Sequence, residues 1–220
     1  MALKYVLFDL DGTLTDSMLG ITNCAMYALE KFDIHPASRE ELLPYIGPPL
    51  TESFMRFHGL SAEQATQAVA YYRERFSVVG WKENAVYDGV VALLRELQQL
   101  GICLIVATSK PEVFTHRILE HFDLKKYFAF VSGSTLDGLR SEKADVIAHV
   151  QKTYPDINNE NAIMVGDRKH DIIGAHKQGL CAIGVLYGYG DRTEMEAVGA
   201  DFIAADMVAL RQLLLTMVNS

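Results

Sequence analysis

The chain has 220 residues, half of them apolar, and a formal net charge of −8. This length and composition fit one large domain, or a domain with a smaller insert, and argue against a disordered chain. The acidic balance argues against binding to a nucleic-acid backbone, and no run approaches the roughly 18 consecutive apolar residues of a membrane span.

The cysteines are three in number, far apart and in apolar contexts: Cys24, Cys103 and Cys181. We therefore expect buried free thiols rather than disulfides, as in a cytosolic protein. The N-terminus runs directly into an apolar segment and shows no signal-peptide pattern. The sequence thus predicts a cytoplasmic protein.

The first informative segment is an apolar run at residues 6–8 that ends in Asp9-Leu10-Asp11-Gly12-Thr13. It predicts a buried strand that delivers two carboxylates to its C-terminal end, the edge of an α/β sheet where ligands bind. Gly12 breaks the strand and can bring both acids toward one point. Two such acids can act as nucleophile and proton carrier, although Asp residues also simply cap turns.

Residues 17–80 show helical periodicity and no strand pattern, so we expect an all-helical insertion. Ser17 is a candidate N-cap, and Ser61 with Gln64 has the spacing of a capping box. The segment Gly47-Pro48-Pro49 interrupts the helices. Aromatic residues of this block are expected to form its core: Tyr71, Tyr72 and Phe76.

From residue 88 onward, strands and helices alternate with short connections. The expected strands are 102–107, 128–131, 162–165, 181–185 and 201–203. The expected helices are 90–100, 111–122, 141–154, 171–178 and 206–218. This pattern predicts an α/β fold with a doubly wound parallel sheet, formed by residues 1–15 and 84–220, with a helical domain at 16–83 inserted after the first strand.

Polar side chains follow the later strands of this sheet. Thr108, Ser109 and Lys110 offer hydroxyls, backbone N–H groups entering a helix and an ammonium, a set that suits a phosphate or caps a helix. Asp167 and Asp171 follow the strand at 162–165. Asp171 is equally suited to capping the next helix.

Asp167 and Asp171, together with Asp9 and Asp11, would place four acids at one edge of the sheet. Four carboxylates so close together cannot all stay ionised without a counter-ion. Mg²⁺ held by oxygen ligands fits that need. Lys143 near a helix start, where a positive charge is disfavoured, indicates an electrostatic role, although most such lysines are merely solvated.

In combination, these segments resemble the haloacid dehalogenase-like hydrolase superfamily. The resemblance rests on FDLDGT at 8–13, Thr108, Lys143 and GDRKHD at 166–171. TSKPE at 108–112 and GVLYGYG at 184–190 are similar to its phosphoglycolate phosphatase and 5′-nucleotidase-like branches. The dehalogenases themselves lack the acid that Asp11 supplies here.

The resemblance implies a Rossmann-like core, a small helical cap and hydrolysis of a small phosphate ester. Asp9 would form an aspartyl-phosphate, and Asp11 would protonate the leaving alcohol and then activate water. Mg²⁺ would bind the Asp9 carboxylate, the backbone carbonyl of Asp11 and Asp167, with Asp171 a further candidate.

The resemblance also implies which groups hold the phosphate and the substrate. Thr108, the backbone at Ser109 and Lys143 would hold phosphate oxygens, Lys110 is a further candidate, and Gly47 lies in the expected substrate-specificity loop.

Other functions remain open at this stage. A phosphomutase similar to β-phosphoglucomutase shares all four signatures. Phosphonate cleavage requires a lysine in the cap that forms a Schiff base, and Lys31 lies on a regular predicted helix with no feature that indicates this role. A binding module on the same fold is also possible, since fold does not fix function. The expected partner is a small phosphate ester, with no nucleic acid and no membrane, and the sequence predicts no oligomeric state.

Overall fold

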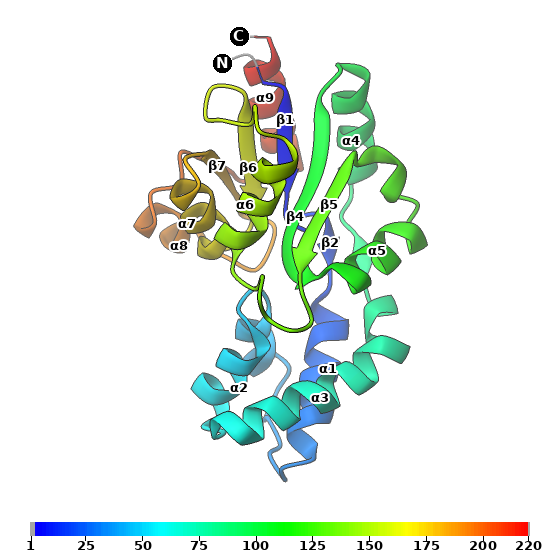
Figure 1. The fold of residues 1–220 in the computed structure, drawn as a ribbon. Coiled ribbons are helices and arrows are strands. Elements are labelled where there is room, and N and C mark those ends of the chain that lie inside the picture. Colours follow the sequence, from blue (N-terminus) through cyan, green and yellow to red (C-terminus); the bar gives the residue numbers. More distant parts are fainter. Residues whose placement is uncertain (1–2, 220) are drawn as a thin grey trace. The chain divides into compact units, whose positions relative to one another are not determined.

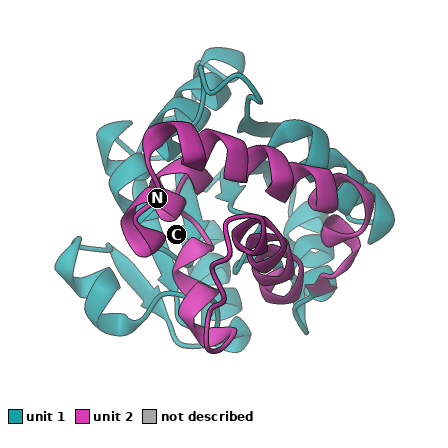
Figure 2. Ribbon diagram, turned by 90° about the horizontal axis from the view of Figure 1, so that it is seen from below, with its two compact units in different colours: residues 1–15, 86–220 teal, residues 16–85 magenta. Residues whose placement is uncertain are grey.

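The computed structural model describes residues 3–219 of the chain. Two compact units divide them: residues 1–15 with 86–220, and residues 16–85 (Figure 2). The chain crosses between the units at two short strands that pair with each other, β2 (Thr15–Asp16) and β3 (Ala85–Val86). No helix within the described range is long and apolar enough to cross a bilayer.

The first unit is built on a six-stranded parallel sheet with the order β5-β4-β1-β6-β7-β8 (Figure 1). Its strands are β1 (Tyr5–Phe8), β4 (Cys103–Pro111), β5 (Phe130–Ser134), β6 (Ala162–Gly166), β7 (Cys181–Val185) and β8 (Phe202–Ala204). The central strands are fully buried apolar runs, as expected for strands covered on both faces. The predicted α/β fold with a parallel sheet is confirmed.

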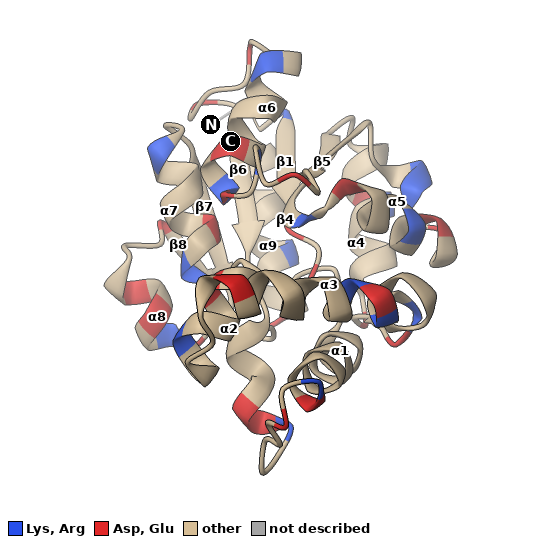
Figure 3. Ribbon diagram, turned by 60° about the horizontal axis from the view of Figure 1, so that its bottom comes forward, with Lys and Arg blue, Asp and Glu red and all other residues tan. Residues whose placement is uncertain are grey.

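Helices connect these strands. They are α4 (Val90–Gln99), α5 (Glu112–His121), α6 (Lys143–Thr153), α7 (Lys169–Lys177), α8 (Arg192–Ala197) and α9 (Met207–Val218), with a 3₁₀ turn, η3, at Lys125–Tyr127. Side chains of α6 and α7 form one apolar core with Leu7, Ile105 and Met164 of the sheet. Acidic and basic residues are interspersed along helices such as α5 and α8 (Figure 3).

Because β1 lies between β4 and β6, the C-terminal ends of these three strands meet at one edge of the sheet. The strand order changes direction around β1, and such switch points are where open α/β sheets bind ligands. This topology decides which strand ends can share a site.

The second unit is helical: α1 (Met18–Glu30), η1 (Glu40–Tyr45), α2 (Leu50–His58), α3 (Ala62–Val78) and η2 (Gly80–Lys82). Within it, α3 packs against α1 and α2. Ser61 and Gln64 form the predicted capping box, with hydrogen bonds of 3.2 and 2.9 Å. Tyr72 and Phe76 are buried and stacked, whereas Tyr71 is half-buried.

Several local predictions are confirmed only in part. Ser17 is the N-cap residue of α1, but its side chain makes no capping hydrogen bond, and Met18 N donates to Asp16 Oδ1 at 3.1 Å. The 3₁₀ helix η1, Glu40–Tyr45, contains Pro44, and the short helix α8 was not predicted. The three cysteines are free, and only Cys24 among them is fully buried.

Candidate active site

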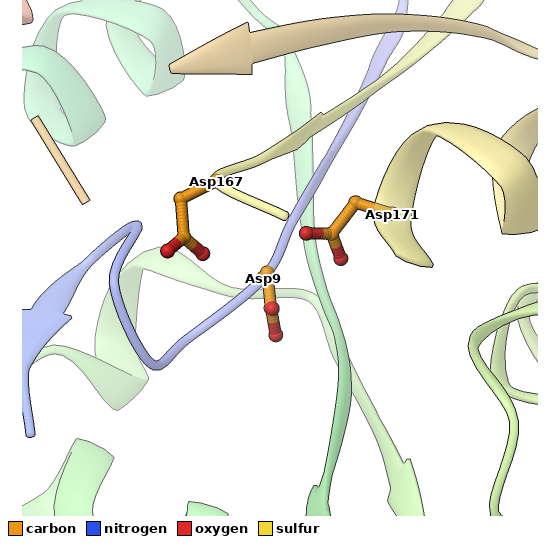
Figure 4. Close-up of side chains that lie close together, drawn as sticks. All are labelled: Asp9, Asp167 and Asp171. Carbon is orange, nitrogen blue, oxygen red and sulfur yellow. The ribbon is translucent and has the colours of Figure 1, made fainter. Parts of the chain in front are cut away.

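Three carboxylates meet where β1 and β6 end. Asp9 directly follows β1, Asp167 directly follows β6, and Asp171 lies in the first turn of α7. One oxygen of each lies within 4.8 Å of an oxygen of the others, and all three residues are buried (Figure 4). The parallel pairing of β1 with β6 produces this convergence, since it brings the C-terminal ends of both strands to the same edge.

Lys143 supplies the positive charge of this cluster. It is the first residue of α6, and its Nζ lies 2.9 Å from Asp9 Oδ1 and 2.7 Å from Asp171 Oδ1. The same ammonium donates a 2.9 Å hydrogen bond to the Ala107 carbonyl oxygen. The contact with Ala107 is a hydrogen bond, and the contacts with the two carboxylates are ion pairs. The burial of this lysine agrees with the electrostatic role that its position in the sequence indicated.

The ionisation of the cluster is strongly perturbed. Burial, with the charges of Asp171 and Asp9, holds the pKa of Asp167 well above its usual range. Burial raises the pKa of Asp171 to about 6, against the lowering effect of Lys143. For Lys143, burial alone would lower the pKa, but the carboxylates of Asp171 and Asp9 outweigh it and raise the pKa.

The donor set fits a hard divalent cation. The cluster has three buried carboxylates, and the one ammonium of Lys143 pairs with two of them, so negative charge is in excess. Carboxylate oxygens are the ligands that Mg²⁺ prefers, and a cation beside them would offset the repulsion that raises the pKa of Asp167. Asp9, Asp167 and Asp171 could hold such an ion.

Asp167 is surrounded by hydrogen-bond donors and closely packed glycines that the sequence did not predict. Tyr189 N donates to its Oδ2 at 2.8 Å, and Thr13 Oγ1 donates to its Oδ1 at 3.3 Å. A Cβ on Gly12 or Gly188 would lie 2.1 or 2.5 Å from Asp167 Oδ2, so only glycine fits at either position. The available signal was the repeated glycine in Gly188-Tyr189-Gly190 after β7.

The same segment is fixed from a second side by Tyr187. Its hydroxyl donates to the Thr13 carbonyl oxygen at 3.0 Å, and its ring lies edge-on to that of Tyr87. Burial, with the nearby charge of Asp167, raises the pKa of the Tyr187 hydroxyl, so it remains a neutral donor. The loop after β7 therefore holds the loop after β1 in place beside Asp167.

Asp171 has the helix-capping role that the sequence left open, and its role toward a metal stays a prediction. Its Oδ2 accepts a 3.0 Å hydrogen bond from Arg168 N, at the N-terminus of α7, while its Oδ1 faces Lys143. Arg168 is held in turn by Glu194 of the unpredicted helix α8, at 2.9 Å. A Cβ on Gly166 would lie 2.2 Å from the Asp171 carboxyl carbon, so this close approach requires glycine.

Asp11 lies apart from these three acids. Its carboxylate accepts two hydrogen bonds from Lys110 Nζ, at 2.8 and 3.0 Å. We expected four carboxylates to meet at one point, but the cluster contains three of them, and Asp11 is not part of it. The physical reason is that Asp11 lies beyond the end of β1 and pairs with an ammonium from β4.

Thr108, Ser109 and Lys110 belong to β4 rather than to a helix start. The strand continues to Pro111 with a register shift after Ala107, and α5 begins at Glu112. The expectation that residues 108–110 present the N–H groups of a helix start is therefore wrong, since these described residues are part of a strand. Thr108 is buried, and its Oγ1 accepts a 3.2 Å hydrogen bond from Lys110 N.

Gly47 belongs to the helical unit, between η1 and α2. Its φ of 108° lies in the left-handed region that favours glycine. Its role toward a substrate stays a prediction.

A family model described as haloacid dehalogenase-like hydrolase matches residues 6–185. A 5′-nucleotidase from Pseudomonas aeruginosa is 44% identical over 215 residues, which is 97% of each chain. The crystal structure of a predicted phosphatase from Clostridium acetobutylicum has 47% identity and a TM-score of 0.95, covering 98% of this chain and 100% of that one.

Two further relatives have different names. The tyrosine-protein kinase PtkA of Mycobacterium tuberculosis is 41% identical over 188 residues, covering 85% of this chain and 63% of that one. A phosphoglycolate phosphatase of Vibrio parahaemolyticus is 29% identical over 217 residues, with 94% of each chain covered. Because the family model spans most of the chain, including every acid of the site, this protein belongs to the haloacid dehalogenase-like hydrolase family.

Proposed function

We propose that this protein is a Mg²⁺-dependent phosphatase that hydrolyses small phosphate monoesters through an aspartyl-phosphate on Asp9. The observation that carries the proposal is the buried Asp9 carboxylate beside Lys143, with Asp167 and Asp171 within 4.8 Å. A negatively charged phosphate can approach a carboxylate nucleophile only where other charges offset the repulsion. Lys143 and a cation held by the acids would provide that offset.

In the proposed first step, an Asp9 oxygen attacks phosphorus and the bond from phosphorus to the ester oxygen breaks. Asp11 gives its proton to the leaving alcohol. In the second step, Asp11 takes a proton from water, whose oxygen attacks phosphorus, and the bond to Asp9 breaks to release inorganic phosphate. Mg²⁺, when bound by Asp9, Asp167, Asp171 and the backbone carbonyl of Asp11, supplies charge stabilisation of the phosphoryl oxygens.

We assign the phosphate contacts to Lys143, Thr108 and the backbone N–H of Ser109. Lys143 is suited to that role because its ammonium is fixed beside Asp9. Thr108 is suited because it is buried on β4, the strand next to β1, and its hydroxyl hydrogen is not used by the bond from Lys110 N. Such fixed donors stabilise developing charge without reorganisation.

We further propose that residues 16–85 act as a cap that excludes water, with Gly47 in its substrate-specificity loop. A capped site favours small substrates over macromolecules, in keeping with the net charge of −8. The 44% identity to a 5′-nucleotidase favours a nucleoside 5′-monophosphate over a phosphoglycolate-like ester. We place the enzyme in the cytoplasm.

A second candidate function differs only in the acceptor of the phosphoryl group. The relative named tyrosine-protein kinase PtkA is 41% identical to this chain, so a protein tyrosine hydroxyl is an alternative to water. A sugar hydroxyl, as in a phosphomutase, is a third acceptor. Incubation with labelled substrate separates these, since label appears in free phosphate, in protein tyrosine or in an isomeric sugar phosphate.

The test is phosphate release from a panel of phosphorylated metabolites with Mg²⁺, by wild type and by Asp9→Asn. Asp9→Asn should abolish both phosphate release and the hydroxylamine-sensitive label that marks an acyl phosphate on the protein. Asp137→Asn is a matched control, because Asp137 is an exposed acid outside the cluster. Phosphate release that survives Asp9→Asn would overturn the mechanism.

A further inference from the structure

Lys110 and Asp11 form a close ion pair at the edge of the sheet. Lys110 Nζ lies 2.8 Å from Asp11 Oδ2 and 3.0 Å from Oδ1, so both carboxylate oxygens accept from one ammonium. The Lys110 side chain is 5% exposed and that of Asp11 is 14% exposed. The pair is therefore shielded from the solvent that weakens exposed pairs, and it holds the orientation of the carboxylate.

The backbone at Lys110 is itself fixed. Its N–H donates to Thr108 Oγ1 at 3.2 Å. Its carbonyl oxygen packs so closely on β5 that a Cβ on Gly133 would lie 2.8 Å from it. The Lys110 side chain therefore extends from a well-packed backbone position on β4, and its ammonium links Asp11, in the loop after β1, to that strand.

The two buried ammonium groups of the site have different partners. Lys143 contacts Asp9 and Asp171, which belong to the three-acid cluster. Lys110 contacts Asp11, the acid outside that cluster. Lys143 is thus the ammonium beside Asp9, the proposed nucleophile, and Lys110 is the ammonium beside Asp11.

We propose that Lys110 is a positioning residue for Asp11, and that it acts on the reaction through Asp11 rather than by binding the phosphoryl group. This inference rests on the proposed function, which assigns proton transfer to Asp11. Each carboxylate oxygen has two lone pairs, so an oxygen that accepts from Lys110 can still bond the leaving-group oxygen or the attacking water. Proton transfer requires that geometry before anything else.

The test compares Lys110→Met with wild type on two esters. One is p-nitrophenyl phosphate, whose leaving group needs little protonation, and the other is an alkyl phosphate, whose leaving group needs a proton. Loss of positioning should lower kcat/KM, which reports the step that forms the aspartyl-phosphate, by about 10- to 100-fold for the alkyl ester and by less for the aryl ester, since general acid catalysis contributes about 10²- to 10⁴-fold. The dissociation constant of inorganic phosphate, measured by calorimetry with Mg²⁺, should change by less than about twofold, since phosphate needs no proton from Asp11.

Further variants separate this role from a structural one. Lys110→Arg keeps a charged donor beside Asp11 and should restore part of the lost kcat/KM for the alkyl ester. Lys110→Met placed on Asp11→Asn should cause no further loss, because residues that act as a unit are not additive. Lys125→Met removes a lysine from an exposed pair with Glu120 and controls for the loss of one charge.

The opposite results would overturn the inference. A phosphate dissociation constant raised about tenfold or more, with equal losses on both esters and additive effects in the double variant, would make Lys110 a direct phosphate ligand. Failure of the proposed function is distinguishable, because it appears as phosphate release by Asp9→Asn. If Lys110→Met does not fold, Lys110→Arg on the same two esters decides the question.

Discussion

Lys143 Nζ lies 2.9 Å from Asp9 Oδ1, which joins the first residue of α6 to the residue that follows β1. A lysine is disfavoured at a helix N-terminus and in a protein interior, so its place there depends on its carboxylate partners. Asp171, at 2.7 Å, is the second partner. The residues proposed for chemistry thus also hold three elements of the fold together.

Lys143→Met should therefore damage stability and activity together. Removing one partner of a buried pair leaves uncompensated charges and costs about 3–5 kcal/mol of unfolding free energy. Phosphate release should fall by about 100-fold or more, as with loss of other fixed donors. Urea unfolding and phosphate assays measure the two effects. Lys177→Met is the control, since Lys177 forms a long, exposed pair with Glu142 at 3.9 Å, and it should leave both quantities unchanged.

Asp167→Asn should make the metal-free protein more stable while abolishing activity. Asp167 is buried beside two other acids, and the pKa of its carboxyl is held well above the usual range by burial and those charges. Removing one like charge should raise the unfolding free energy at pH 7 by about 1–3 kcal/mol. Thermal unfolding should show that Mg²⁺ raises the melting temperature of wild type but not of Asp167→Asn. A variant less stable than wild type in the presence of a chelator would contradict the repulsion argument.

The stability of the metal-free protein should also depend on pH through Asp171. Its pKa rises from 3.8 to about 6 on folding, chiefly because of burial. Between those values the folded state binds more protons than the unfolded state, so this residue's contribution to stability falls as pH rises. At about 1.4 kcal/mol per pKa unit, the fall is on the order of 1–3 kcal/mol.

The comparison of Asp171→Asn with wild type isolates that contribution from other acids. The difference in unfolding free energy, variant minus wild type, should grow between pH 4 and pH 6.5 in the presence of a chelator. Urea titrations at half-unit steps of pH provide the measurement. A difference that is flat over this range would show that Asp171 does not titrate there.

The sequence predicted the sheet and the meeting of Asp9 with Asp167 because each of these acids directly follows an apolar run. Buried parallel strands produce that pattern directly, and parallel pairing brings the ends together. The position of Asp11 was not predictable in the same way. Side-chain alternation along a strand does not tell whether Asp11, which lies beyond the end of β1, points toward Asp9 or toward β4. In the folded structure its carboxylate pairs with Lys110 of β4.

The surroundings of Asp167 were missed for a related reason. The hydrogen bond from Tyr189 N, the donor Thr13 and the close approach of Gly188 depend on how the loop after β7 folds back. No periodicity in a single sequence encodes contacts between loops that are far apart in the chain. The short helix α8, whose Glu194 holds Arg168, lies in the same region and was missed as well.

Gly188→Ala tests whether this loop shapes the acid cluster. A Cβ at position 188 would lie 2.3 Å from the Gly12 carbonyl oxygen and 2.4 Å from Asp167 Cβ, so the loop or the carboxylate must move. Overpacking of this kind costs about 1–3 kcal/mol. If Asp167 moves, the rise in melting temperature caused by Mg²⁺ should shrink or vanish.

Gly179→Ala is the matched control in the same unit. Gly179 has a φ of 69° and nothing within 4 Å of a Cβ, so alanine there adds only backbone strain of about 1 kcal/mol. It should unfold at a lower temperature than wild type but keep the full Mg²⁺ effect. Thermal unfolding of both variants, with Mg²⁺ and with a chelator, separates lost stability from a displaced Asp167. Equal Mg²⁺ effects in the two variants would mean that the loop after β7 stabilises the fold without positioning the acid.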